Sequence, residues 1–293
     1  MRLPETIHLN GAPVRHFRLP GAPAAGAALV VPGSPGMVSF YVPFLRRLHQ
    51  RSDQALTVAA ASHVGHSPGV RCDGERGWFN LDDQVKNHRR YLDEQMPDGP
   101  VHLIGHSIGC HLILRMLEEL PLERVGRIIL LFPTIERMAD TPNGRTLGPL
   151  FGRFRRLTLA GLTRVARLPP LLRAPLLRAR YLRPTPPVER PLMLRALMNI
   201  DERSLVNILH MADEEVRTVG EISQPLLRRW SPRMTLLYGQ NDAWNRPDFA
   251  PEMRARLDGR GEVIEDAAGI SHAFVLDAAT EIADFTYTRL TDG

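Results

Sequence analysis

A pentapeptide of the form Gly-x-Ser-x-Gly, at residues 105–109, lies between an apolar strand at 101–104 and a helix that begins at Ser107. A turn this tight strains the backbone of the serine and leaves almost no room beside it, so glycine is needed at Gly105 and Gly109. Such a turn holds the hydroxyl exposed at the carboxyl edge of a sheet, where the dipole of the following helix favours developing negative charge. The pattern therefore predicts a nucleophilic Ser107; the alternative is a purely structural strand-to-helix turn.

The composition is that of a globular protein of ordinary size. A chain of 293 residues with 43% hydrophobic residues can form one large α/β domain with an insertion. No apolar run approaches the ~18 residues that a membrane-spanning helix needs, and the first residues do not begin a signal peptide. Cys72 and Cys110 are the only cysteines, so neither a disulfide framework nor a cysteine zinc site is indicated. We expect a cytoplasmic protein that is not secreted, and nothing implies a metal or cofactor.

Strand and helix patterns alternate along most of the chain. Asn10-Gly11, between two short strand-like segments, is a strong hairpin signal. We expect strands at 7–9, 14–17, 27–31, 55–61, 101–104, 128–132, 234–238 and 262–264, and helices at 40–50, 81–95, 107–120, 247–257 and 273–290. This alternation predicts an α/β fold with a mostly parallel sheet and helices on both faces. The interruption at 137–230 is interpreted as a helical cap inserted into a core of residues 1–136 and 231–293.

A serine hydroxyl is a poor nucleophile at neutral pH, so it needs a base and a carboxylate that orients the base. The order along the chain expected after such an elbow is serine, acid, histidine. His272 lies in the loop between the last strand and the last helix, where the base is expected, whereas His210 lies in the cap. Asp242 follows a buried strand in a short turn, and we prefer it as the acid over Glu136 and Asp140.

Acyl transfer also needs hydrogen-bond donors for the oxyanion of the tetrahedral intermediate. The backbone N–H of Ile108 directly follows the nucleophile and is one candidate. The other is Ser34, in the loop 33–36 after the first long parallel strand, because the neighbouring Pro35 has no N–H. The alternative interpretation of this loop is a surface turn rich in proline and glycine.

Arginine is concentrated in one part of the predicted cap. Residues 145–195 hold twelve arginines and one acidic residue, so this segment carries +11 and the rest of the chain −6. Between 147 and 168, apolar residues recur every three or four positions and predict one amphipathic helix. Its opposite face carries Arg153, Arg156, Arg164 and Arg167. The helix is either a lid with solvated arginines or an interfacial segment on an anionic membrane or lipid surface. A nucleic-acid site is disfavoured because no aromatic stacking platform accompanies the arginines.

Several longer strings resemble one known family, the lipid-droplet-associated hydrolases. The strings are PGSPG at 32–36 with FYVPF at 40–44, SHVGH at 62–66, LDDQV at 81–85, LFPTIERM at 131–138, YGQNDAW at 238–244 and SHAF at 271–274. The resemblance spans residues 29–145 and 234–276 and is weak in the cap. It implies an α/β-hydrolase fold and a triad of Ser107, Asp242 and His272. It also implies neutral-lipid esters as a substrate class and peripheral association with lipid droplets.

The residues and the resemblance together predict a serine hydrolase of carboxylic esters with long or bulky acyl groups, which acts through an acyl-enzyme. A thioesterase, an acyltransferase or a polyester depolymerase would use the same machinery. An alternative of a different class is a lipid-surface binding protein with weak hydrolase activity. The expected partners are a lipid or ester substrate and the surface of a lipid droplet or anionic membrane, and not a nucleic acid.

Overall fold

The computed structural model describes residues 3–22, 25–70, 77–183, 185–187, 190–266 and 268–291. Within these residues one sheet contains eight strands, namely β1 (Glu5–Leu9), β2 (Ala12–Leu19), β3 (Ala27–Val31), β4 (Thr57–Ala61), β5 (Val101–His106), β6 (Val125–Leu131), β7 (Met234–Gly239) and β8 (Glu262–Asp266). The strand order is β1-β2-β4-β3-β5-β6-β7-β8. β2 runs antiparallel to both neighbours, and all the other pairs are parallel. The predicted α/β fold with a mostly parallel sheet is confirmed.

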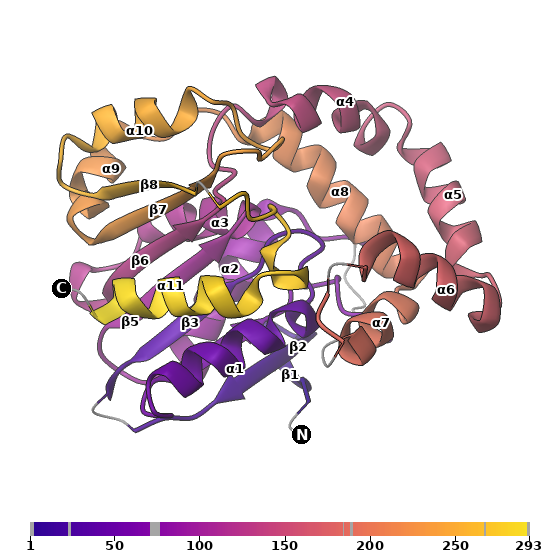
Figure 1. Ribbon diagram of the computed structural model, residues 1–293, viewed down its shortest axis with the longest axis horizontal. Helices are drawn as coiled ribbons and strands as arrows, with labels where there is room; N and C mark the ends of the chain where they lie inside the picture. Colours follow the sequence, from indigo (N-terminus) through magenta and orange to yellow (C-terminus); the bar gives the residue numbers. More distant parts are fainter. Residues whose placement is uncertain are drawn as a thin grey trace.

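Helices cover both faces of this sheet (Figure 1). α1 (Val42–Arg51) and α11 (Ala279–Thr291) pack together on one face. The other face carries α2 (Leu81–Gln95), α3 (Ile108–Leu117), α9 (Gln224–Trp230) and α10 (Phe249–Leu257). In β3, for example, Leu29 packs on the side of α3 and Val30 on the side of α1. Because the central strands are buried on both faces, they read as continuous apolar runs.

Local signals explain where several elements begin. Asn10 and Gly11 have φ angles of 50° and 76°, the geometry of the two-residue hairpin turn that their sequence predicts. α2 begins where predicted because Asn80 and Asp83 form a capping box, in which each side chain accepts a hydrogen bond from the backbone N–H of the other residue. The last helix begins at Ala279 and not at 273, because a short 3-10 turn at Phe274–Leu276 comes first.

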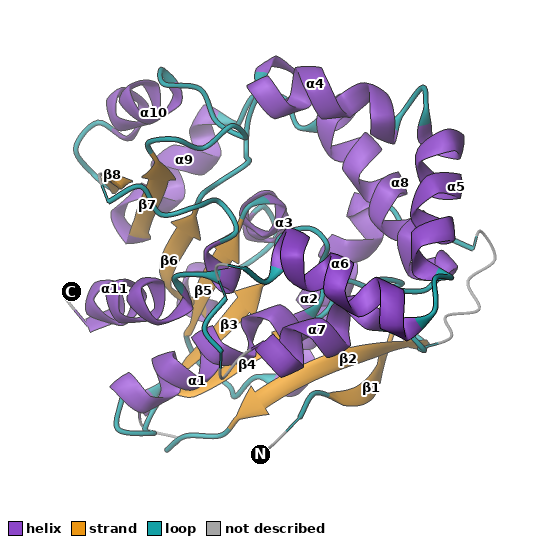
Figure 2. Cartoon of the chain, turned by 45° about the vertical axis from the view of Figure 1, so that its right-hand side comes forward, coloured by secondary structure: helices purple, strands orange, loops and turns teal. Residues whose placement is uncertain are grey.

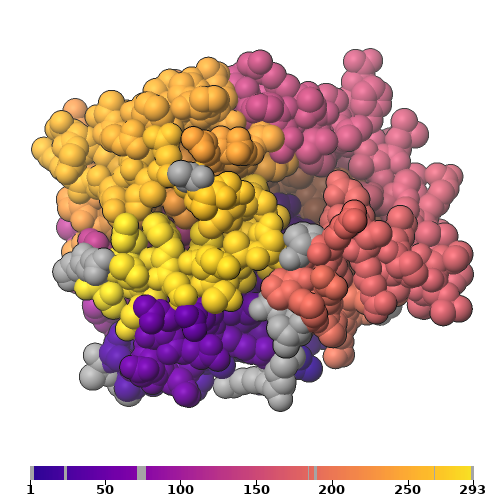
Figure 3. All heavy atoms as spheres, viewed as in Figure 1, coloured from indigo at the N-terminus to yellow at the C-terminus, as the bar shows by residue number. Residues whose placement is uncertain are grey.

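Six α-helices in the described part of the chain connect β6 to β7. They are α4 (Pro142–Phe151), α5 (Arg155–Ala166), α6 (Pro170–Tyr181), α7 (Arg190–Met198), α8 (Glu202–Thr218) and α9. α4 and α5 both pack against α8, which is 17 residues long. Figure 2 shows α4 to α8 gathered beside one end of the sheet. In the space-filling view a recess separates this group from the yellow C-terminal part of the chain (Figure 3).

The prediction of one helix over 147–168 is wrong. α4 ends at Phe151, and α5 begins at Arg155. The chain turns at Gly152, which comes so close to α8 that a Cβ atom there would lie 2.6 Å from Oδ1 of Asp213. The apolar residues therefore do not form one continuous face: Phe151 lines an interior cavity, whereas Leu157 is exposed.

The division into a core and a cap at 137–230 stays a proposal. Within the proposed cap, α9 packs Leu227 and Trp230 into the same apolar core as α10. No helix in the described ranges is long and apolar enough to cross a membrane. Cys110 is a buried free cysteine, and Cys72 lies outside the described residues.

Candidate active site

Ser107 stands at the turn between β5 and α3. Its φ and ψ angles are 53° and −125°, a strained combination for a residue with a side chain. A Cβ atom on Gly105 would lie 2.8 Å from the backbone N of Cys110, and one on Gly109 would lie 2.1 Å from the carbonyl O of Val31. Only glycine fits at these two positions, so the turn depends on both of them.

Three side chains from three loops meet at the carboxyl edge of the sheet. Ser107 follows β5, Asp242 follows β7 and His272 follows β8. The hydroxyl of Ser107 lies 2.9 Å from Nε2 of His272, and Nδ1 of His272 lies 2.6 Å from Oδ2 of Asp242. Neighbouring parallel strands end at the same edge, which brings residues so distant in sequence into contact.

The carboxylate of Asp242 is fixed by three donors. Oδ1 accepts a hydrogen bond from the N–H of Trp244 at 2.8 Å, and Oδ2 accepts one from the side-chain amide of Asn245 at 2.9 Å in addition to that from His272. Burial alone would raise the pKa of this carboxyl, but the hydrogen bonds and the charge of His272 outweigh burial and lower the pKa below its ordinary value. Asp242 is therefore ionised and held in place, as a residue that orients an imidazole must be.

The other candidate residues lie elsewhere. Glu136 is buried, and its Oε2 accepts a hydrogen bond from Arg256 at 2.8 Å. Asp140 is exposed at the surface, and the ring of His210 packs against Trp78. In the described ranges, none of the three makes a hydrogen bond or an ion pair with the serine or histidine above.

The backbone beside Ser107 offers two unpaired donors. The N–H groups of Ser34 and Ile108 have no hydrogen-bond acceptor among the described residues. Ile108 is the first residue of α3, so its N–H is one of those that a helix leaves unpaired at its amino end. The loop of Ser34 lies close to the serine side chain, because a Cβ atom on Gly33 would be 2.7 Å from Cβ of Ser107. Both N–H groups remain candidate oxyanion donors.

A buried pair that the sequence did not single out, Tyr41 and His106, joins two of these loops. The hydroxyl of Tyr41 accepts a hydrogen bond from the N–H of Gly33 and lies 2.6 Å from Nδ1 of His106. Nε2 of His106 lies 2.8 Å from the carbonyl O of His272. Burial lowers the pKa of His106 to about 3, so the ring is neutral. The sequence signals were a histidine at a variable position of the pentapeptide and a tyrosine in the string FYVPF, and neither signal indicates what the side chain contacts.

Three more buried histidines, His63, His66 and His88, form a cluster next to the loop of Ser34. Nδ1 of His66 donates to the carbonyl O of Pro35 at 2.9 Å, and Nδ1 of His63 lies 2.9 Å from Nε2 of His88. Burial lowers the pKa of His66 to about 4 and that of His88 to about 3. His63 and His66 belong to the string SHVGH, which in the sequence analysis supported only the family resemblance. Their buried contacts with His88 and Pro35 give these two histidines a structural role.

Two cavities flank His272. One has a volume of about 200 Å³, and its walls include Ser107, Phe151, Glu215 and Trp244. The other has a volume of about 160 Å³, and its walls include Phe40, Leu197, Val275 and Leu276. The loop of Ser34 and Pro35 lines both cavities. A substrate at Ser107 could therefore extend in two directions, one of them mostly apolar.

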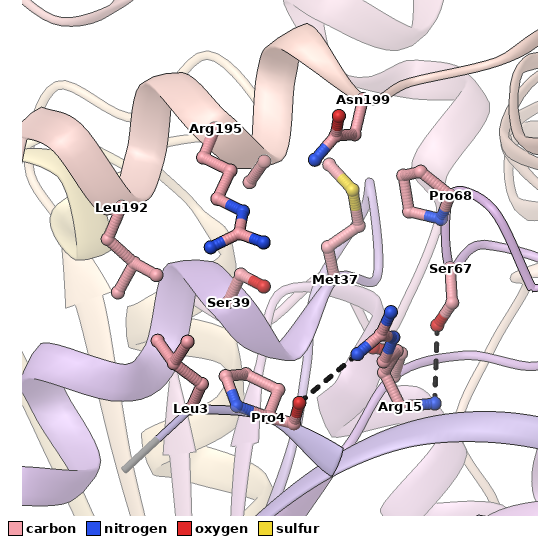
Figure 4. Close-up of a pocket in the computed structure, with 12 residues that line it drawn as sticks. Leu3, Pro4, Arg15, Met37, Ser39, Ser67, Pro68, Leu192, Arg195 and Asn199 are labelled. Atoms are coloured by element: carbon pink, nitrogen blue, oxygen red, sulfur yellow. Dashed lines mark hydrogen bonds between the residues drawn. The ribbon is translucent and has the colours of Figure 1, made fainter. Parts of the chain in front are cut away.

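A further pocket lies away from these residues. Arg15 and Arg195 line it from β2 and α7, and Arg15 donates to the carbonyl O of Pro4 (Figure 4). None of the residues in its walls contributes to the cavities beside His272. The pocket is therefore separate from the candidate active site.

The proposed surface arginines are all exposed, namely Arg153, Arg156, Arg164 and Arg167. Arg167 forms an ion pair with Glu202 at 3.0 Å. Large exposed apolar residues gather between α4 and α6, and they are Leu150, Phe154, Leu157, Leu162, Leu171, Leu172, Leu176 and Tyr181. Elsewhere in the described residues, only Leu3 and Leu122 are large, apolar and exposed.

The strand order, and a serine in a strained turn between a strand and a helix, define this chain as an α/β-hydrolase. Solved structures of other proteins have the same fold. An enol-lactonase from Burkholderia xenovorans is 15% identical, with a TM-score of 0.67 over 98% of this chain and 100% of that chain. A haloalkane dehalogenase variant from Bradyrhizobium elkanii is also 15% identical, with a TM-score of 0.70 over 98% of this chain and 96% of that chain. Identities this low show the fold alone.

Sequence comparison defines the family. The family model described as lipid-droplet associated hydrolase matches residues 26–275, so the chain belongs to this family of hydrolases. The lipid droplet-associated hydrolase of Gallus gallus is 29% identical over 90% of this chain and 84% of its own length. That of Homo sapiens is 28% identical over the same shares of the two chains. The resemblance inferred from the sequence is thereby confirmed.

Proposed function

We propose that this hydrolase cleaves carboxylic esters through Ser107, His272 and Asp242. The observation that carries the proposal is the continuous chain of hydrogen bonds from the Ser107 hydroxyl through His272 to Asp242, at 2.9 and 2.6 Å. A serine in this arrangement gains a base within hydrogen-bond distance, and the base gains a carboxylate that fixes its tautomer.

The reaction has two halves. Oγ of Ser107 forms a bond to the ester carbonyl carbon, its proton passes to Nε2 of His272, and the carbonyl oxygen becomes an oxyanion. The N–H groups of Ser34 and Ile108 stabilise that oxyanion. When the C–O bond to the alcohol breaks, Nε2 gives the proton to the leaving oxygen and an acyl-enzyme remains. Water then repeats the sequence at the acyl carbon and releases the acid and the free serine.

The cavities and the exposed surface support a proposal for the substrate class. The cavity beside Phe40, Leu197 and Val275 is apolar and accepts a hydrocarbon chain. Exposed leucines and arginines of α4 to α6 form a surface suited to peripheral contact with a lipid droplet or an anionic membrane. The family name, which refers to lipid droplets, supports the same direction. We infer a lipid or long-chain ester as the substrate.

A fluorophosphonate probe tests the nucleophile. The wild-type protein should be labelled and should hydrolyse p-nitrophenyl esters, and Ser107→Ala should lose both properties while its thermal unfolding stays close to that of the wild type. Ser34→Ala, which keeps the backbone N–H, serves as the control and should retain labelling. Labelling that persists in Ser107→Ala would show that another residue is the nucleophile. An unlabelled wild-type protein that still binds lipid emulsions would favour the lipid-surface binding alternative.

A further inference from the structure

Glu215 is a buried carboxyl group in the wall of the cavity above Ser107. It lies on the inward side of α8, and its residue is 6% exposed. The same cavity is lined by Ser107 and His272 and by the side chains of Phe151 and Trp244. A carboxyl group so close to the nucleophile faces the space that a substrate would occupy.

The carboxyl group of Glu215 has no partner in the described part of the protein. Its Oε1 atom is buried without a hydrogen bond, and no ion pair or side-chain hydrogen bond of Glu215 is present among the described residues. Burying such a group without compensation costs on the order of 1–3 kcal/mol. Because this unpaired group lines the cavity beside the nucleophile, it is available to pair with a bound substrate.

The surroundings keep this carboxyl group neutral. Burial, followed by the nearby charge of Glu214, raises the pKa of Glu215 to about 8. No arginine or lysine lines the cavity, whose only other titratable side chain in the described residues is His272. On α8 itself, Asp213 is paired with Arg217, and Glu214 accepts a hydrogen bond from the N–H of Leu81. At neutral pH, Glu215 therefore both donates a hydrogen bond from its O–H and accepts one at its carbonyl oxygen.

We propose that Glu215 is a substrate-binding residue that exchanges hydrogen bonds with a free hydroxyl group on an uncharged ester. The ester is then a partial ester of a polyol or an ester of a hydroxy acid, with its hydrocarbon chain in the apolar cavity on the other side of His272. The proposal rests on the ester hydrolysis proposed above. A hydroxyl group is the matching partner because it also donates one hydrogen bond and accepts others. An ammonium group would need an ionised carboxylate instead.

Matched esters test this specificity. In 3-hydroxypropyl butanoate and butyl butanoate, a hydroxyl in the alcohol part replaces a methyl group of similar size. Methyl 3-hydroxybutanoate and methyl 3-methylbutanoate make the same exchange in the acyl part. The wild-type protein should favour the hydroxyl member of at least one pair by about tenfold or more in kcat/KM, because a site built for a hydroxyl leaves its own polar group unpaired with the analogue.

Two variants separate the hydrogen bond from the shape. Glu215→Gln keeps a donor and an acceptor and should retain most of the preference for the hydroxyl ester. Glu215→Met should reduce the ratio of kcat/KM for the hydroxyl ester to kcat/KM for its methyl analogue to about one. Glu221→Gln, at an exposed residue just after α8, is the control and should leave the ratio as in the wild type. Glu215→Met should also raise Tm by about 3 °C or more, because it removes an unpaired buried polar group. A residue retained for structure would instead lower Tm when replaced.

Two results would overturn the proposal. One is an equal kcat/KM for both members of both pairs in the wild-type protein. The other is a preference for butyrylcholine over 3,3-dimethylbutyl butanoate that grows above pH 8, because this would show that an ionised Glu215 binds a cation.

A binding measurement distinguishes the failure of the Glu215 proposal from the failure of the proposed esterase function. In Ser107→Ala, which should not turn over the ester, 3-hydroxypropyl butanoate should raise Tm more than butyl butanoate does. The double variant with Glu215→Met should lose the difference. A Tm difference that survives in the double variant would place the hydroxyl away from Glu215, whatever the activity.

Discussion

The ring of His106 donates a hydrogen bond from Nε2 to the backbone carbonyl of His272, at a distance of 2.8 Å. The direction of this hydrogen bond follows from the contact that the other ring nitrogen, Nδ1, makes with Tyr41. The hydroxyl of Tyr41 accepts the N–H of Gly33 and so gives its own proton to Nδ1 of His106, which leaves the ring proton on Nε2. The loop of the candidate oxyanion donor Ser34 and the loop of the candidate base are therefore tied to one buried neutral imidazole.

Removing the Tyr41 hydroxyl tests this link. Tyr41→Phe leaves Nδ1 of His106 and the N–H of Gly33 without their partner, and both loops gain freedom. We expect kcat for a p-nitrophenyl ester to fall, by up to about a hundredfold for a displacement near 1 Å, with a smaller change in KM. Tyr91→Phe is the control, because the Tyr91 hydroxyl contacts His16 far from the site. An unchanged kcat in Tyr41→Phe would show that the network does not position the reacting groups.

The choice of acid is tested by two amide substitutions of the same kind. Asp242→Asn keeps the shape but removes the charge next to His272, so kcat should fall by orders of magnitude, on the order of 10⁴. Glu136→Gln should have a much smaller effect on kcat, because Glu136 pairs with Arg256. Steady-state kinetics of both variants at pH 7.5 provide the measurement. The reverse ranking would assign the acid to the loop after β6.

The buried histidines predict a loss of stability in acid. Folding lowers the pKa of His66 to about 4 and that of His88 to about 3, whereas a histidine in an unfolded chain titrates near 6.5. Below pH 6.5 the unfolded chain therefore binds protons that the folded chain does not. The contribution of these histidines to the free energy of unfolding should be fully present above pH 6.5. The free energy of unfolding should then fall as the pH drops toward 4, by about 1.4 kcal/mol per pH unit for each histidine.

Urea unfolding at pH 7, 6 and 5 measures this slope. His88→Gln keeps a side chain that can hydrogen-bond to His63 but cannot take up a proton, so the slope should become shallower. His8→Gln, on the exposed side of β1, is the matched control. A slope in His88→Gln equal to that of the wild type would mean that this histidine does not contribute to acid unfolding.

Sequence patterns predicted the sheet and those candidate site residues that lie in the loops after strands. Ser107, Asp242 and His272 each follow a parallel strand, and the carboxyl ends of parallel strands lie at one edge of the sheet. The pairing of Tyr41 with His106 and the burial of Glu215 depend on packing between segments far apart in the chain, and no local pattern encodes such contacts. The break at Gly152 had a local signal, since glycine weakens a helix, but the apolar periodicity of 147–168 outweighed it in the prediction.

The exposed arginines predict binding to anionic lipid. Each arginine near a membrane surface contributes about 1 kcal/mol, and salt screens this attraction. The protein should co-sediment with anionic vesicles at low salt and leave them at high salt. The quadruple Gln variant of Arg153, Arg156, Arg164 and Arg167 should bind much less but still hydrolyse a small soluble ester. Arg167 should contribute least, because it already pairs with Glu202.

A double Gln variant of Arg228 and Arg260 is the control for that experiment. Both residues are exposed, in α9 and next to β8, away from the proposed surface. Their replacement should leave vesicle binding nearly unchanged. If the control lowers binding as much per charge as the quadruple variant does, the attraction comes from net charge and not from the helices of the cap.

The exposed leucines predict a second contribution to lipid binding, which salt should not remove. Leu157, Leu171 and Leu172 are 73%, 87% and 62% exposed, so they stabilise the fold little where they stand. If they enter a lipid surface, each should add up to about 2 kcal/mol through burial of apolar area, and this attraction does not depend on charge. The triple Ser variant should therefore lose binding to neutral triacylglycerol emulsions at both low and high salt, while its Tm stays close to that of the wild type.

Leu122→Ser is the control, because Leu122 is 41% exposed near the start of β6, at the opposite edge of the sheet. Emulsion binding that survives the triple substitution would mean that this surface does not meet lipid, and hydrolysis of emulsified esters would then have to begin elsewhere on the protein.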